Sequence, residues 1–347
     1  VTAPMVLLAN PKYAAMVMDA RSGEILHSEN ANKRLHPASL TKMMTLYVVF
    51  QAVENGEISL DKKVKISRHA ASEPPSKLGL RPGQKVRLRY LIRAAAVKSA
   101  NDAATALGEA IEGSEAAFAR RMNRTAKAMG MNRTTFKNAH GLTESGHLST
   151  ARDMTILGRH LFYDFPDYYH LFARKTASAG SKKVRNTNRR FLSNYRGADG
   201  IKTGYTRAAG YNLVASANRN GERIITTVFG GRSTTTRNAQ VAKLMNLGFE
   251  RAPRHVKLQK PKPPSYIAIA RANPAINLSK SLRPKIRPTY NTVNNLFAVN
   301  EFKSDILSAL KKAQVADNSI EKPPEGYTKI SLNSAPEPTY KIETVKY

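Results

Sequence analysis

Two pairs of predicted strands stand at opposite ends of a helical block, and this order constrains the fold more than any other feature of the sequence. Residues 13–19 and 24–28 form the first pair, and residues 211–217 and 223–229 form the second. A short turn joins the strands of each pair, which predicts two hairpins. Hairpins build antiparallel sheets, so the two ends of this region are expected to meet in one sheet.

Helices and a further strand are predicted between and after these hairpins. Residues 198–206, entered through a glycine turn, predict the fifth strand. The sequence therefore predicts an α+β fold, in which helices flank an antiparallel five-stranded sheet and a helical subdomain is inserted. The predicted helices cover 39–55, 91–97, 103–111, 115–129, 149–162 and 233–249, a polar segment at 64–67 predicts a small hairpin, and 86–92 is expected to start a helix.

The composition changes after about residue 251 of this 347-residue chain, since 11 of its 18 prolines lie between Pro253 and Pro338. Proline-rich segments favour extended, poorly packed chain. We therefore predict a folded domain at 1–251, which is the domain that carries the catalytic motifs described below. The basic C-terminal extension at 252–347 is expected to be largely extended or disordered, with one short helix near 302–313.

The helix predicted over 39–55 carries a nucleophile and a base near its start. Ser39 and Lys42 are three positions apart, so they share one helix face. A serine hydroxyl needs a base, and a neutral lysine can serve if burial or a second cation lowers its pKa. Taken alone, the pair is more typical of a serine cap and a snorkelling lysine than of a catalytic pair.

Two more short motifs follow in the chain. Ser99 and Asn101 lie in a turn between two predicted helices, where they also suit a helix cap. Lys202, Thr203 and Gly204 lie on the fifth predicted strand, where a glycine lets a ligand approach the backbone. Three such motifs in the order S-x-x-K, S-x-N and K-T-G are hard to attribute to chance.

Together these motifs resemble the fingerprint of the penicillin-recognising serine enzymes. The surrounding residues narrow the resemblance to the low-molecular-mass penicillin-binding proteins, specifically the D-alanyl-D-alanine carboxypeptidase family. It implies a β-lactamase/transpeptidase-like fold and removal of the terminal D-alanine from peptidoglycan stem peptides. It covers roughly 13–249, and the extension resembles neither the β-rich domain nor the anchor of typical members. The segments that carry it are 37–45, 99–104, 138–142, 149–154, 199–206 and 209–212.

The resemblance assigns the catalytic roles to residues of the first two motifs. Ser39 would be the acylated nucleophile, and Lys42 would be its general base. Ser99 would relay the proton to the leaving group. Asn101 would orient the substrate amide.

Substrate binding falls to the third motif and to one arginine. Lys202 and Thr203 would bind the terminal carboxylate, and the charge of Lys202 would lower the pKa of the general base. Gly204 and Tyr205 would pair with the substrate backbone, and the oxyanion would lie on the N–H groups of Tyr205 and the nucleophile. Arg237 is a further carboxylate-binding candidate, which could instead be a solvated helix arginine.

Charge and composition restrict the partners. Lys and Arg number 56 against 25 Asp and Glu, a net charge of +31 that suggests a polyanionic partner. No nucleic-acid recognition signature accompanies it, so cell-wall polymer or anionic lipid is expected to meet the basic tail. There are no cysteines and no paired histidines at metal-ligand spacing, so no metal or cofactor is expected. The sequence contains no run of about 18 apolar residues, so no membrane span is predicted.

The resemblance implies peptides ending in D-Ala-D-Ala as substrates and β-lactams as covalent inhibitors. It also implies an exported, periplasmic or otherwise extracytoplasmic protein associated with the wall or the membrane surface. The chain begins at Val1 without the basic region of a signal peptide, which is compatible with a processed N-terminus.

Three alternatives stay open. A DD-endopeptidase would use the same motifs to cut peptidoglycan cross-links. A serine β-lactamase shares the fold, but no Glu-x-x-Leu-Asn segment follows Asn101 to activate the deacylating water. A nonenzymatic wall-binding or nucleic-acid-binding protein would explain the charge and leave the three motifs unexplained.

Overall fold

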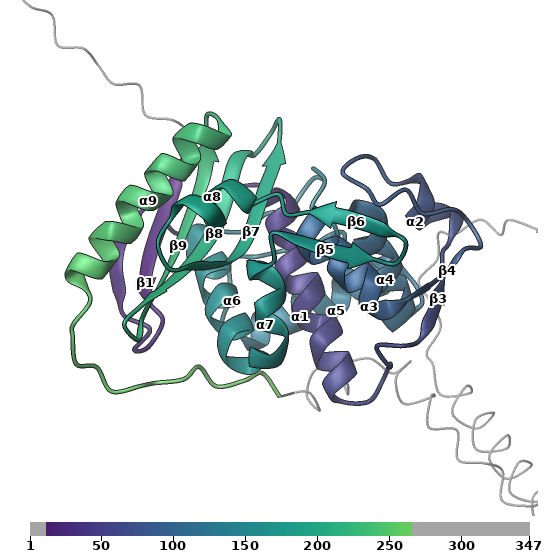
Figure 1. Cartoon of the computed structure of the whole chain (residues 1–347), viewed down its shortest axis with the longest axis horizontal. Helices are drawn as coiled ribbons and strands as arrows, with labels where there is room; N and C mark the ends of the chain where they lie inside the picture. The colour runs from purple at the N-terminus through teal and green to yellow at the C-terminus, as the bar shows by residue number, and fades with distance from the viewer. Residues whose placement is uncertain (1–11, 266–347) are drawn as a thin grey trace, which may run out of the picture. The chain divides into compact units, whose positions relative to one another are not determined.

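The structure is a computed structural model that describes residues 12–265 (Figure 1). Its main sheet has five antiparallel strands in the order β2-β1-β9-β8-β7, so the N-terminal hairpin meets the C-terminal strands as predicted. The register places Val17 opposite Thr226, and Lys202 opposite Val214. The strands are β1 (Ala14–Asp19), β2 (Ile25–Glu29), β7 (Ala198–Thr206), β8 (Gly210–Arg219) and β9 (Glu222–Gly231).

Helices cover both faces of this sheet. Helix α9 (Thr234–Arg251) packs on one face, and helix α6 (Ala151–Asp164) packs on the other. Successive residues of a strand point to opposite faces, so Val17 joins the apolar cluster under α9 while Met16 joins the cluster on the α6 side. The strands are apolar on both faces because both faces are covered.

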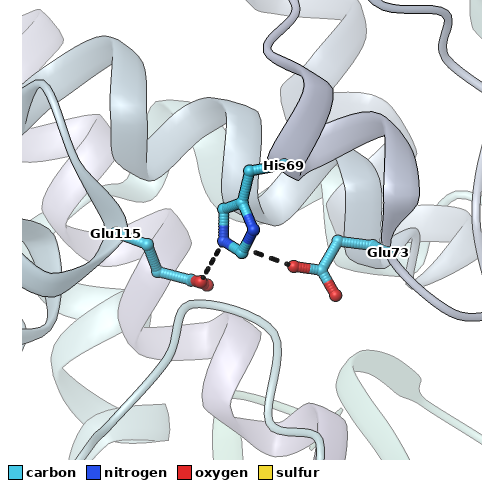
Figure 2. A group of neighbouring side chains, drawn as sticks. All are labelled: His69, Glu73 and Glu115. Carbon is cyan, nitrogen blue, oxygen red and sulfur yellow. Dashed lines mark hydrogen bonds and ion pairs between the residues drawn. The ribbon is translucent and has the colours of Figure 1, made fainter.

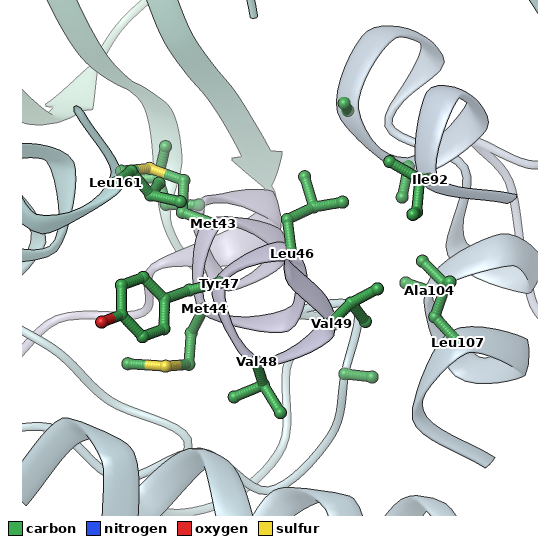
Figure 3. Close-up of a cluster of buried hydrophobic side chains, with 14 of the residues drawn as sticks. Met43, Met44, Leu46, Tyr47, Val48, Val49, Ile92, Ala104, Leu107 and Leu161 are labelled. Atoms are coloured by element: carbon green, nitrogen blue, oxygen red, sulfur yellow. The ribbon is translucent and has the colours of Figure 1, made fainter. Parts of the chain in front are cut away.

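Helix α1 (Thr41–Glu54) runs through the centre of the second cluster, with residues 41–52 buried. Figure 3 shows its apolar side chains spreading in several directions, with Met43 near Leu161 of α6 and Val49 directed toward Leu107 of α4. A helix that is apolar around its circumference belongs in a core. The S-x-x-K motif therefore lies where this buried helix begins.

The helical block forms the subdomain that the sequence predicts. Its bounds differ from the predicted ones at a few places: Ala94–Lys98 is a π-helix, and the turn after it ends at Ala100 rather than at a serine or asparagine cap. Side-chain hydroxyls cap other helices, as Ser114 does for α5. The elements are α3 (Leu88–Arg93), η2 (Ala94–Lys98), α4 (Asn101–Glu112) and α5 (Glu115–Ala128).

The predicted hairpin at 64–67 is wrong. Residues 64 and 65 instead belong to β3 (Lys63–Lys65). This strand pairs with β4 (Lys85–Arg87), and the 19 residues 66–84 separate the two strands in the chain. The partner strand lay inside the segment expected to start a helix, and that helix begins only at Leu88. Elements outside the prediction are α2 (Arg68–Ser72), α7 (Pro166–Ala173), the β5 (Thr176–Ala179) and β6 (Lys182–Arg185) hairpin, α8 (Arg189–Asn194) and the 3₁₀ turn η1 (Ala38–Leu40).

Residues 252–265 contain no helix or strand and run past the turn between β1 and β2. Arg21 donates hydrogen bonds to the carbonyl oxygens of Pro253 (2.7 Å) and Arg254 (3.4 Å), and its own carbonyl accepts from the Gln259 N–H (2.9 Å). The helix predicted near 302–313 lies outside the described residues. None of the helices within 12–265 has the length and apolarity to cross a membrane.

Candidate active site

Ser39 and Lys42 are in direct contact, as their spacing predicts. The Lys42 Nζ atom lies 2.9 Å from the Ser39 Oγ atom. Ser39 lies in the 3₁₀ turn η1 and Lys42 in the first turn of α1, and residues three apart in consecutive helical turns share one face. Lys42 is fully buried while Ser39 is partly exposed at the cleft.

Two fixed oxygens hold the Lys42 amine from the other side. Its Nζ lies 2.7 Å from the Asn101 Oδ1 atom and 2.7 Å from the carbonyl oxygen of His140. The carbonyl is presented by the 138–142 loop, in which the Asn138 side chain accepts from the Gly141 N–H at 2.7 Å. A neutral amine has two protons and one lone pair, so these two acceptors leave the lone pair for the serine hydroxyl.

The surroundings disfavour the charged form of Lys42. Burial lowers the pKa of Lys42 well below its usual value, and the positive charge of Lys202 lowers it further. The carboxylates of Glu73 and Asp102 act in the opposite direction. Desolvation and a like charge are the two conditions that a lysine base requires.

Ser99 and Lys202 form the second contact of the site. The Lys202 Nζ atom donates to the Ser99 Oγ atom at 2.8 Å and to the Thr203 carbonyl at 3.0 Å. Ser99 has φ of +64°, a left-handed conformation that follows the π-helix and turns its hydroxyl toward the cleft. Asp102 holds this region in place by accepting hydrogen bonds from the backbone N–H groups of residues 78–80.

The third motif lies on β7, the edge strand of the sheet. Lys202 is buried, and burial together with the charge of Arg237 lowers the pKa of Lys202 to about 7. Gly204 lies against the nucleophile segment: a Cβ atom there would be 2.9 Å from the Pro37 carbonyl oxygen and 3.1 Å from the Ser39 nitrogen. Only glycine allows this approach. Tyr205 is 55% exposed and packs on Tyr211, with ring centroids 4.3 Å apart.

Arg237 is not a solvated helix arginine, because it is 3% exposed. Its Nη1 donates to the Asn212 carbonyl at 3.1 Å, and its Nε and Nη2 donate to the Asn238 Oδ1 atom at 3.1 and 2.8 Å. Burial lowers the pKa of Arg237 to about 10. The predicted helical periodicity could not show this burial, which results from packing of α9 on one face of the sheet.

These residues line one cleft of about 340 Å³ between the sheet and the helical subdomain. Ser39, Ser99, Asn101, Thr203, Tyr205 and Arg237 border it, while Lys42 and Lys202 are buried behind its wall. Sequence reasoning missed Thr187, whose Oγ1 accepts from the Thr203 Oγ1 at 2.7 Å. Thr187 belongs to no motif, so no signal in the sequence marks it.

A cluster of ionisable groups lies behind the Lys42 side of the cleft. Figure 2 shows His69 between Glu73 and Glu115, with its Nε2 atom 2.9 Å from Glu115 and 3.9 Å from Glu73. Their possible ligand atoms lie within 4.8 Å of one another, although no metal site was expected. His140 Nδ1 accepts from the Leu142 N–H, so its Nε2–H faces Glu73 at 3.3 Å. These ion pairs account for the cluster, and they support the loop that presents the His140 carbonyl.

Comparisons with known proteins identify the family of this chain. Residues 9–233 match the model of the D-alanyl-D-alanine carboxypeptidase family. The chain is 40% identical over 253 residues to the D-alanyl-D-alanine carboxypeptidase DacF of Bacillus subtilis, covering 72% of this chain and 64% of that protein. It spans about 60% to 64% of the length of such curated relatives.

Two solved structures share the fold. Penicillin binding protein 5 from Haemophilus influenzae is 37% identical with a TM-score of 0.66, over 72% of this chain and 73% of that one. Penicillin-Binding Protein D2 from Listeria monocytogenes, in a cefotaxime-bound form, is 36% identical with a TM-score of 0.62, over 68% of this chain and 96% of that one.

Proposed function

This chain belongs to the D-alanyl-D-alanine carboxypeptidase family, and on that premise we propose that it is a serine-type carboxypeptidase. The proposed reaction removes the terminal D-alanine from peptidoglycan stem peptides through an acyl-enzyme on Ser39. The observation that carries the proposal is the buried Lys42 amine, held by the Asn101 amide and the His140 carbonyl and in contact with the Ser39 hydroxyl.

In the proposed acylation step, the neutral Lys42 amine takes the proton of the Ser39 hydroxyl as its oxygen attacks the carbonyl carbon of the penultimate D-alanine. The carbonyl oxygen becomes an oxyanion, which the N–H groups of Ser39 and Tyr205 would stabilise. Donors already in place at a developing charge lower the barrier, because they need no reorganisation at the moment of reaction.

Loss of D-alanine requires a proton on the leaving nitrogen. Ser99 would pass to it the proton that Lys42 took from Ser39, which returns Lys42 to its neutral form. The Ser99 hydroxyl is placed for this role because it borders the cleft, where the Lys202 amine donates to it at 2.8 Å. Asn101 would hold the substrate amide while its Oδ1 accepts from Lys42. Water then attacks the ester, with Lys42 again as the base, and releases the shortened peptide.

The terminal carboxylate of the substrate would bind at the cation-rich end of the cleft. Lys202, which is buried on the edge strand β7, would attract this carboxylate by its charge. The Thr203 hydroxyl would form a hydrogen bond with it. Arg237 borders the same end of the cleft. Gly204 and Tyr205 would pair with the substrate backbone, because β7 has no strand neighbour on its outer side among the described residues. A carboxylate between buried cations explains specificity for a free C-terminus.

The test is digestion of purified stem pentapeptides and of cross-linked peptide dimers by the intact protein. We expect release of one D-alanine from each pentapeptide and little cleavage of the dimers. Efficient cleavage of the dimers without D-alanine release would replace the proposed reaction with that of a DD-endopeptidase.

β-Lactams are proposed as covalent inhibitors, because they present an amide and a carboxylate in the arrangement of the peptide end. Ser39 would open the lactam ring. The amine released by ring opening would stay attached to the acyl group and obstruct the approach of water to the ester. We expect intact-mass spectrometry to show one persistent penicilloyl adduct, absent in Ser39→Ala. Rapid hydrolysis of penicillin with no adduct would instead indicate a β-lactamase.

This function places the protein outside the cytoplasm, where peptidoglycan is found. We propose that it acts in the periplasm or an equivalent extracytoplasmic space at the wall or the membrane surface. Contact of the basic tail with anionic wall or membrane stays part of this proposal. Retention of the protein on isolated wall and on anionic vesicles, measured with and without residues 266–347, tests that contact.

A further inference from the structure

A second groove, of about 740 Å³, adjoins the catalytic cleft. No Asp or Glu lines it, although six of the ten residues that do are basic. Such a concentration of one charge sign in a concave surface raises the local concentration of anions. We call this surface the basic groove, and its cations are Lys77, Lys98, Lys182, Lys183, Arg185 and Arg189.

The fold gathers these cations from separate segments. Lys183 and Arg185 lie on β6, where the side chain of Val184 between them is buried and both basic side chains are exposed. Lys98 ends the π-helix η2, and Arg189 begins α8. Elements far apart in the sequence thus contribute charge to one surface.

Their charges are not neutralised within the described residues. Across 12–265, none of the six cations forms an ion pair with a carboxylate, and Lys182 donates instead to the Leu78 carbonyl at 2.8 Å. Elsewhere in the domain arginines do pair, as Arg121 does with Glu57 at 2.6 Å. Clustered unpaired cations repel one another, and an anionic ligand would relieve that repulsion.

The basic groove is continuous with the cleft. Ser76 and Thr187 line both cavities, and Thr187 contacts Thr203 in the third motif. Arg189 also borders a small pocket of about 210 Å³ that it shares with Arg237. A ligand in the groove therefore lies next to whatever peptide end occupies the cleft.

From this arrangement we infer that the basic groove binds free carboxylates of the peptidoglycan polymer whose D-alanine end is in the cleft. The inference rests on the proposed function. Nucleic acid fits less well, because it offers no peptide end to the adjoining cleft. A flat layer of lipid headgroups does not follow a concave surface. The groove would thus favour polymeric wall over short neutral peptides.

The test compares two substrates and two matched charge reversals in the full chain. Lys183→Glu/Arg185→Glu reverses two of the six cations of the basic groove, and Arg120→Glu/Lys127→Glu reverses two exposed cations of α5 that line none of these cavities. D-Alanine release is measured from isolated wall polymer and from a blocked tripeptide whose only carboxylate is its D-alanine terminus. Co-sedimentation with the polymer measures binding without turnover.

We expect the groove variant to lose kcat/KM on the polymer by on the order of tenfold at low salt, an effect that high salt removes. Its turnover of the blocked tripeptide should equal that of the unaltered protein, which also verifies folding. Equal losses in both charge-reversed variants, or none in either, would overturn the inference. So would loss of binding to anionic vesicles with polymer binding intact. Failure of the unaltered protein to release D-alanine would refute the proposed function, while co-sedimentation would still test the groove.

Discussion

Lys42 illustrates how the surroundings of one side chain select its chemistry. Its amine is buried, faces two oxygens that accept its protons, and lies close enough to Lys202 to feel a like charge. In water the same side chain would be an ammonium ion. The proposed base function therefore depends on residues 59 and 160 positions away in the chain, Asn101 and Lys202.

We expect Ser39→Ala and Lys42→Ala each to abolish D-alanine release, because a nucleophile and its base act as one unit. The double variant should be no slower than either single variant. Steady-state release from a pentapeptide measures this, with the melting temperature as the control for folding. A double variant slower by the product of the single effects would show that the two residues act independently.

The pH dependence of the proposed reaction follows from the lowered pKa of Lys42. The neutral amine is the active form, so kcat/KM should rise with pH through that lowered pKa and fall below it. Lys202→Ala removes a like charge, so the pKa of Lys42 should rise and the acid limb should move to higher pH. Lys243→Ala, on the exposed side of α9, is the matched control and should leave the limb in place. An unmoved limb in Lys202→Ala would contradict the coupling.

At the scale of elements, the loop at 138–142 and the turn before α1 are built against each other. Gly141 has φ of +87°, and a Cβ atom there would lie 1.9 Å from the Ala38 carbonyl oxygen. The loop that presents the His140 carbonyl to Lys42 thus packs directly on the segment that presents Ser39. The proposed nucleophile and base are therefore aligned by this contact as well as by their spacing.

Gly141→Ala should therefore destabilise the protein more than Gly56→Ala. Both glycines have positive φ, which costs an alanine about 1–2 kcal/mol, but nothing lies within 4 Å of a Cβ at Gly56. Thermal unfolding compares the two variants, and kcat reports the loop. We expect only Gly141→Ala to lose kcat in addition to stability. Equal melting temperatures would mean that the 138–142 loop shifts to accommodate the Cβ atom at no cost in stability.

At the scale of the whole molecule, all residues that line the proposed catalytic cleft fall between positions 39 and 237 of the sequence. Residues 252–265 lie outside it, yet they bind the turn between β1 and β2 through Arg21 and contact Arg159 through the Gln259 carbonyl. This segment is therefore expected to contribute to the stability of the domain and not to the proposed reaction.

Truncation after residue 265 should leave both D-alanine release and the melting temperature unchanged. Truncation after residue 251 should keep turnover of a soluble peptide but remove these hydrogen bonds, lowering stability by about 1–3 kcal/mol. Calorimetry and a peptide assay on both shortened chains check this. If the longer of the two chains lost activity, the extension would have to be part of the catalytic domain.

The sequence by itself determined the α+β class, the five strands and the order of the three motifs, because each depends on local spacing. Strand alternation, turn residues and the three-residue separation of Ser39 and Lys42 are readable without a partner. The resemblance then supplied roles for nine residues at once. Short pairings such as β3 with β4 were misread, because their strands are three residues long and distant in the chain.

Only the tertiary structure decided burial, electrostatics and adjacency across the cleft. The pKa of Lys42 depends on Lys202, and the burial of Arg237 depends on where α9 meets the sheet. Thr187 and the cations of the basic groove come from segments that share no pattern. Charge interactions depend on distance in space and on exclusion of water, and neither quantity is a property of the order of residues along a chain.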